Sequence, residues 1–340
     1  MALTDEVILD VRELRAVYRT VRGVVKAVDG ISFDLRQGET LCVVGESGCG
    51  KTATGLSILR LIEGLRGQIV GGQILYHGED ILKYSTEKLR QIRGHKIAMI
   101  FQDPQSSLNP VLRVGEQIAE PMRLHLGLNK IEARARALEL MRQIGIPFPE
   151  RRIDEYPHQF SGGMKQRVMI AMALSCEPDI LIADEPTTAL DVTTKAQIMD
   201  IFRQLKQNKS MSIIFITHDM GIVADMADKI VVMYGGRLAE AAGVLDVFDK
   251  PQHPYTQGLL KCLPDILAGQ GRLEPIPGNI PSLIDPPENC NFNPRCPYVM
   301  TVCREKRPPE YITAPGHRVA CFLYTKFPVH SQPQKEGAKA

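Results

Sequence analysis

The chain has 340 residues, of which 44% are hydrophobic, and 41 basic residues nearly balance 39 acidic ones. A chain of this length and composition can bury a large core, so we expect a globular protein of one large or two modest domains. The net charge of +2 excludes the strong positive field that recruits nucleic acid, and no nucleic-acid partner is expected.

No membrane-spanning segment or secretion signal is expected from the sequence. The chain has no run of about 18 apolar residues. Residues 1–10 lack the basic and then apolar layout of a signal peptide. We therefore expect a cytosolic chain, whose role at a membrane, if it has one, depends on partner proteins.

The first third of the chain has the pattern of strands followed by a loop and a helix. Residues 8–18 and 24–35 alternate loosely and end in turn residues, which predicts an antiparallel β patch. Residues 40–44 form a short apolar run that ends in a glycine-rich loop, and helical spacing returns over residues 54–65. Strand, loop and helix in this order are the setting that a phosphate-binding loop requires.

The middle of the chain predicts a helical insert and then an α/β core with a parallel sheet. Residues 97–101 are a buried-type strand, 103–110 have loop composition, and 114–144 have helical spacing. Helices and strands then alternate, as in a sheet with crossover helices. The expected ranges are 162–175 and 194–207 for helices, and 180–183 and 212–216 for strands.

The composition changes near Lys250, where the chain becomes rich in proline and loses its periodicity. The expected division is therefore a domain over 1–250, an extension over 251–330 and a flexible polar tail over 331–340.

Residues 45–52 match the pattern G-x-x-x-x-G-K-[ST], in which backbone N–H groups wrap phosphates at a helix N-terminus. Lys51 is expected to neutralise the β and γ phosphates of ATP, and Thr52 to bind Mg²⁺. The alternative is a chance glycine-rich turn between a strand and a helix. The predicted nucleotide-binding residues are Gly45, Glu46, Ser47, Gly48, Cys49, Gly50, Lys51 and Thr52.

Two adjacent carboxylates follow the apolar residues 180–183. Asp184 is expected at the carboxyl end of a buried strand, where it can reach the Mg²⁺ ion. Glu185 can accept a proton from the water that attacks the γ-phosphate, or orient that water. The alternative is that an Asp-Glu-Pro turn simply ends the strand.

A third segment distinguishes this chain from other phosphate-loop ATPases, because it resembles the signature of the ATP-binding-cassette (ABC) family. Its residues include Ser161, Gly162, Gly163 and Gln166. Alone, these could be an ordinary helix N-cap. The resemblance implies that two cassettes bind head to tail, and that the signature of each completes the ATP site of the other. It also implies an ABC nucleotide-binding domain, with a RecA-like phosphate-loop core, an antiparallel β subdomain and a helical subdomain over about 103–175.

Other positions match the ABC pattern over roughly residues 7–245. By this resemblance, Gln102 senses Mg²⁺ and the attacking water, and Asp191 belongs to the loop that couples the two sites. His218 resembles the histidine that contacts the γ-phosphate, although a lone histidine is more often structural. Tyr18 lies where an aromatic ring stacks on adenine, although a tyrosine in a strand is commonly a packing residue.

Residues 101–110, 164–174 and 251–260 resemble the ATPases of dipeptide, oligopeptide and nickel importers, with the D-type ATPases of peptide importers the closest group. This likeness implies a second ATPase subunit that is a paralogue, two membrane permeases and, indirectly, an extracytoplasmic substrate-binding protein. The chain would be peripheral, at the cytoplasmic face of the cell membrane.

Four of the eight cysteines lie near the C-terminus, at Cys290, Cys296, Cys303 and Cys321. They resemble the cluster ligands of this importer group, which implies a [4Fe–4S] centre that stabilises a small proline-rich region. Their spacing lacks the C-x-x-C pairs of ferredoxins and common zinc sites. Inert buried thiols and a zinc site are the alternatives.

We therefore predict an ATPase that energises import of dipeptides or oligopeptides. The alternative within transport is an importer of nickel or another small solute. A non-transport ABC ATPase of DNA repair or translation is disfavoured, because no sustained heptads and no second phosphate loop occur. An iron–sulfur redox or sensing module that only retains a nucleotide fold is disfavoured by the presence of Glu185 and His218.

Overall fold

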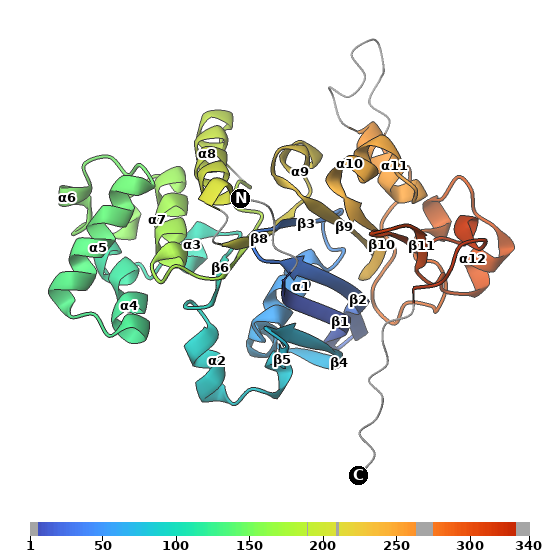
Figure 1. Cartoon of the computed structure of the whole chain (residues 1–340), viewed down its shortest axis with the longest axis horizontal. Coiled ribbons are helices and arrows are strands. Elements are labelled where there is room, and N and C mark those ends of the chain that lie inside the picture. Colours follow the sequence, from blue (N-terminus) through green and yellow to red (C-terminus); the bar gives the residue numbers. More distant parts are fainter. Residues whose placement is uncertain (1–5, 189, 209–210, 263–274, 331–340) are drawn as a thin grey trace.

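The structure is a computed structural model that describes residues 6–188, 190–208, 211–262 and 275–330. The predicted flexible tail over 331–340 lies outside the described residues. Two sheets occupy the centre of the molecule, a group of helices lies at one end, and residues 275–330 lie at the other end (Figure 1). The part of the chain that the structure describes contains no helix with both the length and the apolar character needed to cross a bilayer.

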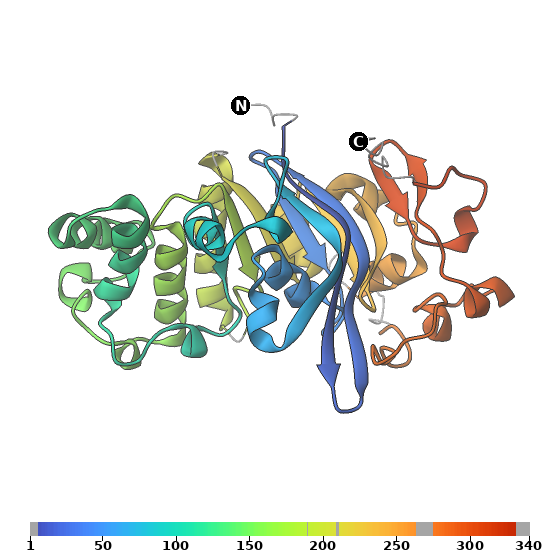
Figure 2. The same cartoon turned by 90° about the horizontal axis from the view of Figure 1, so that it is seen from below.

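The smaller sheet is antiparallel and confirms the β patch predicted near the N-terminus. Its order is β2-β1-β4-β5, and β1 pairs with both long neighbours. The β1–β2 hairpin projects beyond the rest of the molecule (Figure 2). The strands are β1 Val7–Thr20, β2 Gly23–Arg36, β4 Gly67–Tyr76 and β5 Glu79–Asp80.

The larger sheet has the order β11-β12-β10-β9-β3-β8-β7-β6. Strands β9, β3, β8, β7 and β6 run parallel, and all residues of β3, β7 and β8 are buried, as expected of strands covered on both faces. The parallel strands are β3 Thr40–Val44, β6 Ile97–Ile100, β7 Ile180–Asp184, β8 Ser212–Thr217 and β9 Lys229–Tyr234. The antiparallel edge consists of β10 Arg237–Gly243, β11 Tyr311–Ala314 and β12 His317–Val319.

Helices connect the strands of the core. The helix expected over 54–65 is regular only as α1 Lys51–Ile58, and then continues as the 3₁₀ helix η1 Leu61–Leu65, because Arg60 takes a left-handed conformation (φ 52°). The rings of Phe202 and Phe215 pack edge to face at 5.1 Å, which fixes a long helix on the sheet. The remaining core elements are η2 Ile81–Lys83, α2 Thr86–Ile92, α8 Val192–Asn208, α9 Met220–Met226 and α10 Val244–Asp249.

The group of helices at one end runs from α3 to α7 (Figure 1). Asn129 and Glu132 form a capping box that begins α5, while Gly127 (φ 67°) ends α4. Residues 103–110 were predicted to be a loop, but Asp103 caps a one-turn helix within them. The elements are α3 Pro104–Ser107, α4 Val114–Leu126, α5 Lys130–Gln143, α6 Pro149–Arg152, η3 Pro157–Gln159 and α7 Gly162–Leu174.

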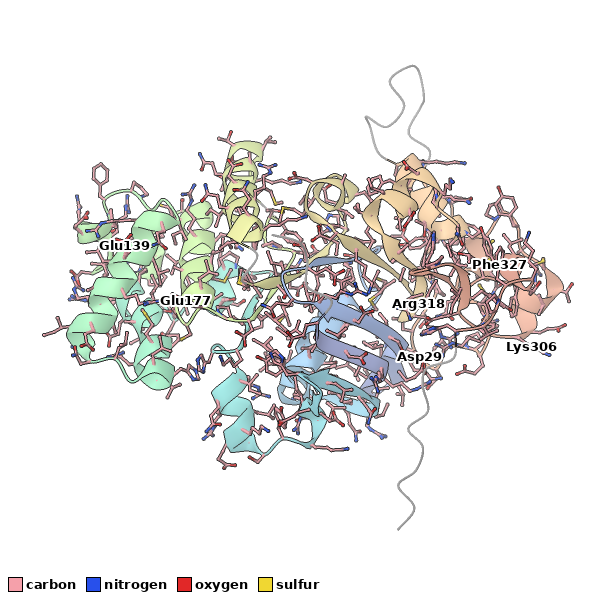
Figure 3. All side chains as sticks on the ribbon, in the orientation of Figure 1. Asp29, Glu139, Glu177, Lys306, Arg318 and Phe327 are labelled. Carbon is pink, nitrogen blue, oxygen red and sulfur yellow. The ribbon has the colours of Figure 1, made fainter. Side chains whose placement is uncertain are left out.

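Residues 251–330 are here called the C-terminal extension, and its strands β11 and β12 continue the larger sheet. Strand β12 pairs with β10, so the change in composition near Lys250 does not separate two sheets. Figure 3 shows Arg318, from β12, where the extension meets the smaller sheet, and its guanidinium donates to the carbonyl of Ser32 at 2.9 Å. The other elements of the extension are α11 Pro254–Lys261, η4 Asn293–Arg295, α12 Thr301–Glu305 and η5 Phe322–Tyr324.

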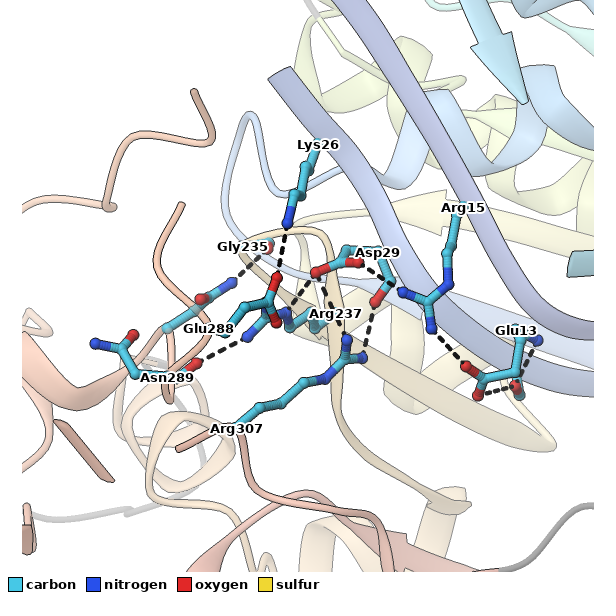
Figure 4. Close-up of polar contacts among 11 residues, drawn as sticks. Glu13, Arg15, Lys26, Asp29, Gly235, Arg237, Glu288, Asn289 and Arg307 are labelled. Atoms are coloured by element: carbon cyan, nitrogen blue, oxygen red, sulfur yellow. Dashed lines mark hydrogen bonds and ion pairs between the residues drawn. The ribbon is translucent and has the colours of Figure 1, made fainter. Parts of the chain in front are cut away.

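A buried ion-pair network also connects the extension to the smaller sheet (Figure 4). Arg237 donates to the carboxylate of Asp29 at 2.8 Å, and both side chains are less than a tenth exposed. Arg307 donates to the Asp29 carbonyl at 2.8 Å, and Arg237 also donates to the carbonyl of Asn289 at 2.7 Å. Although burial would raise the pKa of Asp29, the hydrogen bond and charge of Arg237 outweigh it and lower that pKa.

Arg237→Met is expected to lower the free energy of unfolding by about 2–4 kcal/mol, because it leaves the buried Asp29 carboxylate without its closest cation. Urea denaturation followed by circular dichroism would measure the change. Arg203→Met is the matched control. Arg203 pairs with carboxylates at the surface, where an ion pair contributes about 1 kcal/mol or less. Equal losses in both variants would contradict a special contribution of the buried network.

Candidate functional site

The phosphate loop, residues 45–52, connects β3 to α1 and takes a shape that only glycine permits at two positions. Gly45 and Gly50 have φ of 154° and 104°. A Cβ atom at Gly45 would lie 2.3 Å from the carbonyl oxygen of Met233, and one at Gly50 would lie 2.1 Å from that of Ala27. The loop therefore lies directly against the backbone of two other strands, β9 and β2.

The side chain of Lys51 is turned into the loop. It is 4% exposed and donates to the carbonyls of Gly45 at 2.8 Å and Glu46 at 3.1 Å. Its ammonium thus lies within the loop whose backbone N–H groups bind phosphates in proteins with this motif. Cys49 is buried in the same loop, and burial raises the pKa of its thiol, so the thiol is protonated at neutral pH. This chemistry suits a small packing residue and not a nucleophile.

Thr52 and Asp184 are brought together from α1 and the end of β7. The hydroxyl of Thr52 donates to the Asp184 carboxylate at 3.1 Å. Asp184 is 2% exposed, and its burial, together with the neighbouring charge of Glu185, raises its pKa to about 6. A divalent cation at this position would favour the charged carboxylate, so the hydroxyl and the carboxylate are a suitable oxygen donor pair for Mg²⁺.

Glu185 is the point on which several predicted site residues converge. It is buried, and its backbone is left-handed (φ 45°). One carboxylate oxygen accepts from Gln102 at 3.2 Å and from Thr188 at 2.9 Å. The other lies 3.2 Å from Nδ1 of His218 and 3.8 Å from Nζ of Lys51.

This environment keeps Glu185 ionised. Burial alone would raise the pKa of its carboxyl group, but hydrogen bonds from Thr188 and His218 and the charges of His218 and Lys51 outweigh burial, so the pKa is lowered. Glu185 is therefore a proton acceptor at neutral pH, beside Asp184, whose pKa is raised. Thr188 was not among the predicted residues, and its only sequence signal is its place three residues after Glu185.

The predicted signature residues lie elsewhere, at the start of α7. Ser161 caps this helix by accepting from the N–H of Met164 at 3.4 Å, and both Ser161 and Gly162 are exposed. Among the described residues, no hydrogen bond or ion pair joins the signature to the phosphate loop of its own chain. The amide nitrogen of Gln166 is buried without a partner. Ser161 and Gly162 therefore face outward, where a second molecule can reach them, whereas Gln166 is buried.

Two other predicted residues also remain apart from Glu185. Asp191 accepts from the N–H of Thr194 at 3.0 Å and from its hydroxyl at 2.7 Å, which caps the first turn of α8. Tyr18 lies on β1, where its ring meets Gly67, and burial raises its pKa. The roles of Asp191 between sites and of Tyr18 against adenine stay predictions.

The four cysteines predicted to hold a metal cluster all line one cavity of about 10 Å³. They share it with apolar side chains that include Phe292 and Leu323. Burial raises the pKa of Cys290 to about 11 and that of Cys321 to about 12. However, within the described ranges no three His, Cys, Asp or Glu side chains are arranged to hold a metal ion. The structure thus gathers the four thiols around one cavity, but not in an arrangement that holds a metal ion.

Comparison with known proteins extends over both parts of the chain. A family model described as "ABC transporter" matches residues 28–188, and one described as "Oligopeptide/dipeptide transporter, C-terminal region" matches residues 239–303. A probable peptide ABC transporter ATP-binding protein of Sinorhizobium fredii, y4tR, is 48% identical over 93% of this chain and 95% of its own length. The dipeptide transport ATP-binding protein DppD of Bacillus subtilis is 47% identical over 96% of this chain and 97% of its own length.

A solved structure agrees with the fold. The dimeric ATP-binding cassette MJ0796, in a post-hydrolysis state bound to ADP and phosphate, matches with a TM-score of 0.62 at 26% identity and covers 69% of this chain and 98% of its own. The mixed α/β body is therefore an ABC ATPase nucleotide-binding domain. With both family regions present in one chain, this protein belongs to the ABC transporter ATP-binding proteins that carry the oligopeptide/dipeptide transporter C-terminal region.

Proposed function

We propose that this chain hydrolyses ATP to energise a membrane importer of dipeptides or oligopeptides. The observation that carries the ATPase assignment is the convergence of Gln102, Thr188, His218 and Lys51 on the carboxylate of Glu185. The transported substrate is inferred from relatives that are named for transport of peptides and dipeptides.

In this proposal each residue of the cluster has a separate task. Lys51 and the N–H groups of the phosphate loop bind the β and γ phosphates. Thr52, Asp184 and Gln102 hold Mg²⁺, which supplies charge stabilisation at the phosphates. Glu185 accepts a proton from the attacking water or orients it, and its lowered pKa keeps it ready to do so.

His218 is the residue that contacts the γ-phosphate in this proposal. Its side chain is 57% exposed, yet Nδ1 lies 3.2 Å from Glu185. Because Nδ1 pairs with Glu185 and the ring is exposed, Nε2 remains available to bond a ligand held by the phosphate loop.

A second cassette completes the site in trans. Ser161 and the glycines of the signature lie at an exposed helix N-terminus, which favours an anion. The related cassette MJ0796 was solved as a dimer bound to ADP and phosphate. We propose that the partner cassette is a paralogue, and that its signature contacts the γ-phosphate held by this chain.

The remaining partners follow from importer architecture. We propose two membrane permeases, which contact the helices between α3 and α7, and an extracytoplasmic substrate-binding protein that delivers the peptide. The chain itself would be peripheral, at the cytoplasmic face of the membrane. Dimer closure on ATP and reopening after hydrolysis would move the permeases between their two access states.

We also propose that the thiols of Cys290, Cys296, Cys303 and Cys321 hold a [4Fe–4S] cluster. The support is that four cysteines within residues 290–321 line one cavity. A cavity of about 10 Å³ is close to the size of one water, so a cluster requires these segments to move apart. When bound, the cluster would join α12 and the loop before it to η5 through four thiolates.

The catalytic proposal is tested by Glu185→Gln, which keeps the size of the side chain but removes its basicity. ATP hydrolysis is expected to fall about 100-fold or more, while ATP still binds and traps the cassette dimer. Phosphate release and size-exclusion chromatography with ATP would measure the two effects. Glu177→Gln is the control, because Glu177 is also a left-handed glutamate (φ 50°) but pairs with Arg136 at the surface. Undiminished turnover of the Glu185 variant would remove this residue from catalysis.

The transport proposal is tested by purifying the chain through an affinity tag from its native membrane. Two multi-spanning permeases and a second cassette ATPase are expected to copurify, and the reconstituted complex should hydrolyse ATP faster when peptide-loaded binding protein is added. The same complex tested with nickel-loaded binding protein separates a peptide importer from a nickel importer. Ribosomes or DNA-repair proteins as the main partners would contradict transport.

The cluster proposal is tested by iron and sulfide analysis of protein purified without oxygen, together with its visible spectrum. About four irons and four sulfides per chain are expected, and Cys303→Ser should lose most of them. Cys262→Ser is the control, because Cys262 is the C-cap residue that follows α11 and does not line the thiol cavity. A colourless and iron-free but folded protein would contradict the proposal, and one zinc per chain would replace it with a zinc site.

A further inference from the structure

The second residue of the phosphate loop is held by an arginine from the C-terminal extension. Nη1 and Nη2 of Arg295 donate to the two carboxylate oxygens of Glu46 at 2.6 and 3.0 Å. The two residues are 249 positions apart in sequence. Two parallel charge-assisted bonds fix both the distance and the orientation of the carboxylate.

The guanidinium of Arg295 is itself immobilised. Its side chain is 3% exposed, and it donates to the carbonyls of Pro277 at 2.9 Å and Ile276 at 3.1 Å and to the hydroxyl of Tyr234 at 3.3 Å. Because these bonds fix the planar guanidinium group, it defines a single position for the Glu46 carboxylate.

The extension also holds the backbone of Glu46. The N–H of Glu46 donates to the hydroxyl of Tyr255 at 2.9 Å, and Tyr255 is fully buried. Its ring packs on Tyr234 at 4.6 Å and on Phe292 at 5.5 Å. Arg295 follows Phe292 by three residues, so one aromatic cluster supports both contacts to the loop.

These contacts add to the packing of the phosphate loop against β2 and β9, and they matter because ordering this loop costs conformational entropy. It contains three glycines with positive φ, at Gly45, Gly48 and Gly50, and glycine loses the most conformational freedom on ordering. The carbonyl of Glu46 also accepts from Lys51 at 3.1 Å, so the position of Glu46 sets the position of that ammonium. External contacts that order such a loop before the ligand arrives increase affinity.

We propose that Arg295 is a positioning residue of the ATP site, which holds Glu46 and thereby the phosphate loop in its binding shape. The inference rests on the proposed function of this loop as the ATP site. ATP affinity then depends on the same segment of the extension that carries Cys290 and Cys296 on either side of Arg295. A disturbance of that segment weakens ATP binding without touching a residue that contacts ATP.

The test is the Kd for ATP with Mg²⁺, measured by calorimetry on the full chain. Arg295→Gln is expected to raise the Kd about tenfold, the usual effect of losing hydrogen bonds to a charged group. Turnover at saturating ATP should stay within about threefold of the unaltered chain, because Glu185 and its partners are intact. The Kd of the double variant Arg295→Gln and Glu46→Gln for ATP should be no higher than that of the more weakly binding single variant, since both changes break the same interaction.

Arg318→Gln is the matched control. Arg318 is another arginine of the extension that pairs with a carboxylate, Glu310, and donates to a backbone carbonyl, that of Ser32, but it contacts β2 and not the phosphate loop. The Kd of the Arg318→Gln variant for ATP is expected to match that of the unaltered chain. Equal weakening by Arg318→Gln would overturn the proposal, because general docking of the extension would then explain the effect.

The remaining outcomes separate the two proposals. An unchanged Kd in Arg295→Gln, with normal binding by the unaltered chain and loss of binding in Lys51→Ala, would overturn this inference alone. Absence of ATP binding by the unaltered chain would overturn the proposed function, and this inference with it. If Arg295→Gln does not fold, as judged by circular dichroism, Glu46→Gln replaces it, since Glu46 is 29% exposed and its change leaves the aromatic cluster intact.

Discussion

The close approach of the phosphate loop to two other strands is the constraint on which the site depends. Its glycines leave no room for a side-chain carbon against the carbonyls of Ala27 in β2 and Met233 in β9. Gly236 connects the same three segments, because its N–H donates to Cys49 of the loop and its carbonyl accepts from Asp29 of β2. The ion pair between Asp29 and the neighbouring Arg237 therefore fixes the gap in which the loop lies. Correct packing of both sheets is thus a condition for the loop to take its phosphate-binding shape.

The parallel strands of the larger sheet place several predicted site residues close together at their carboxyl ends. Gln102 and His218 follow the carboxyl ends of β6 and β8, and Asp184 is the last residue of β7, which lies between these two strands in the sheet. The signature begins α7 at an exposed position, so its helix dipole points a partial positive charge toward solvent. The phosphate loop and this exposed helix N-terminus therefore lie at separate places on one chain.

The sequence was sufficient to predict the parts of this arrangement that depend on local patterns. The strand before Gly45, the carboxylates after β7 and the helix cap at Ser161 all have signals within a few residues, and each lies where it was expected. The one-turn helix after Asp103 was missed because four residues are too few to show a helical period. The pairing of β12 with β10 was missed because strands of three residues have no recognisable alternation, and the partner lies far away in sequence.

The contacts of Glu46 show a more general limit. In the sequence, Glu46 was predicted to bind nucleotide only as a member of the phosphate loop, because its position is variable in the pattern and the motif assigns no task to its side chain. Its partner Arg295 lies in a proline-rich segment without periodicity, and a bidentate ion pair across 249 positions leaves no local signal in a single sequence. Tyr255 was noted only as part of a stretch that resembles other importers, and its hydrogen bond to Glu46 becomes visible only in the folded chain.

The placement of Tyr255 shows how the larger sheet reaches the phosphate loop through the extension. Glu240 of β10 is fully buried and accepts from the N–H of His253 at 2.8 Å, while His317 of β12 lies 2.7 Å from its other oxygen. Burial lowers the pKa of His253 to about 4, so its ring is neutral and Nδ1 can accept from the N–H of Tyr255 at 3.0 Å. That bond caps α11 and orients Tyr255 toward Glu46. Because each step is buried and directional, the edge strands of the extension and the phosphate loop form one connected structure.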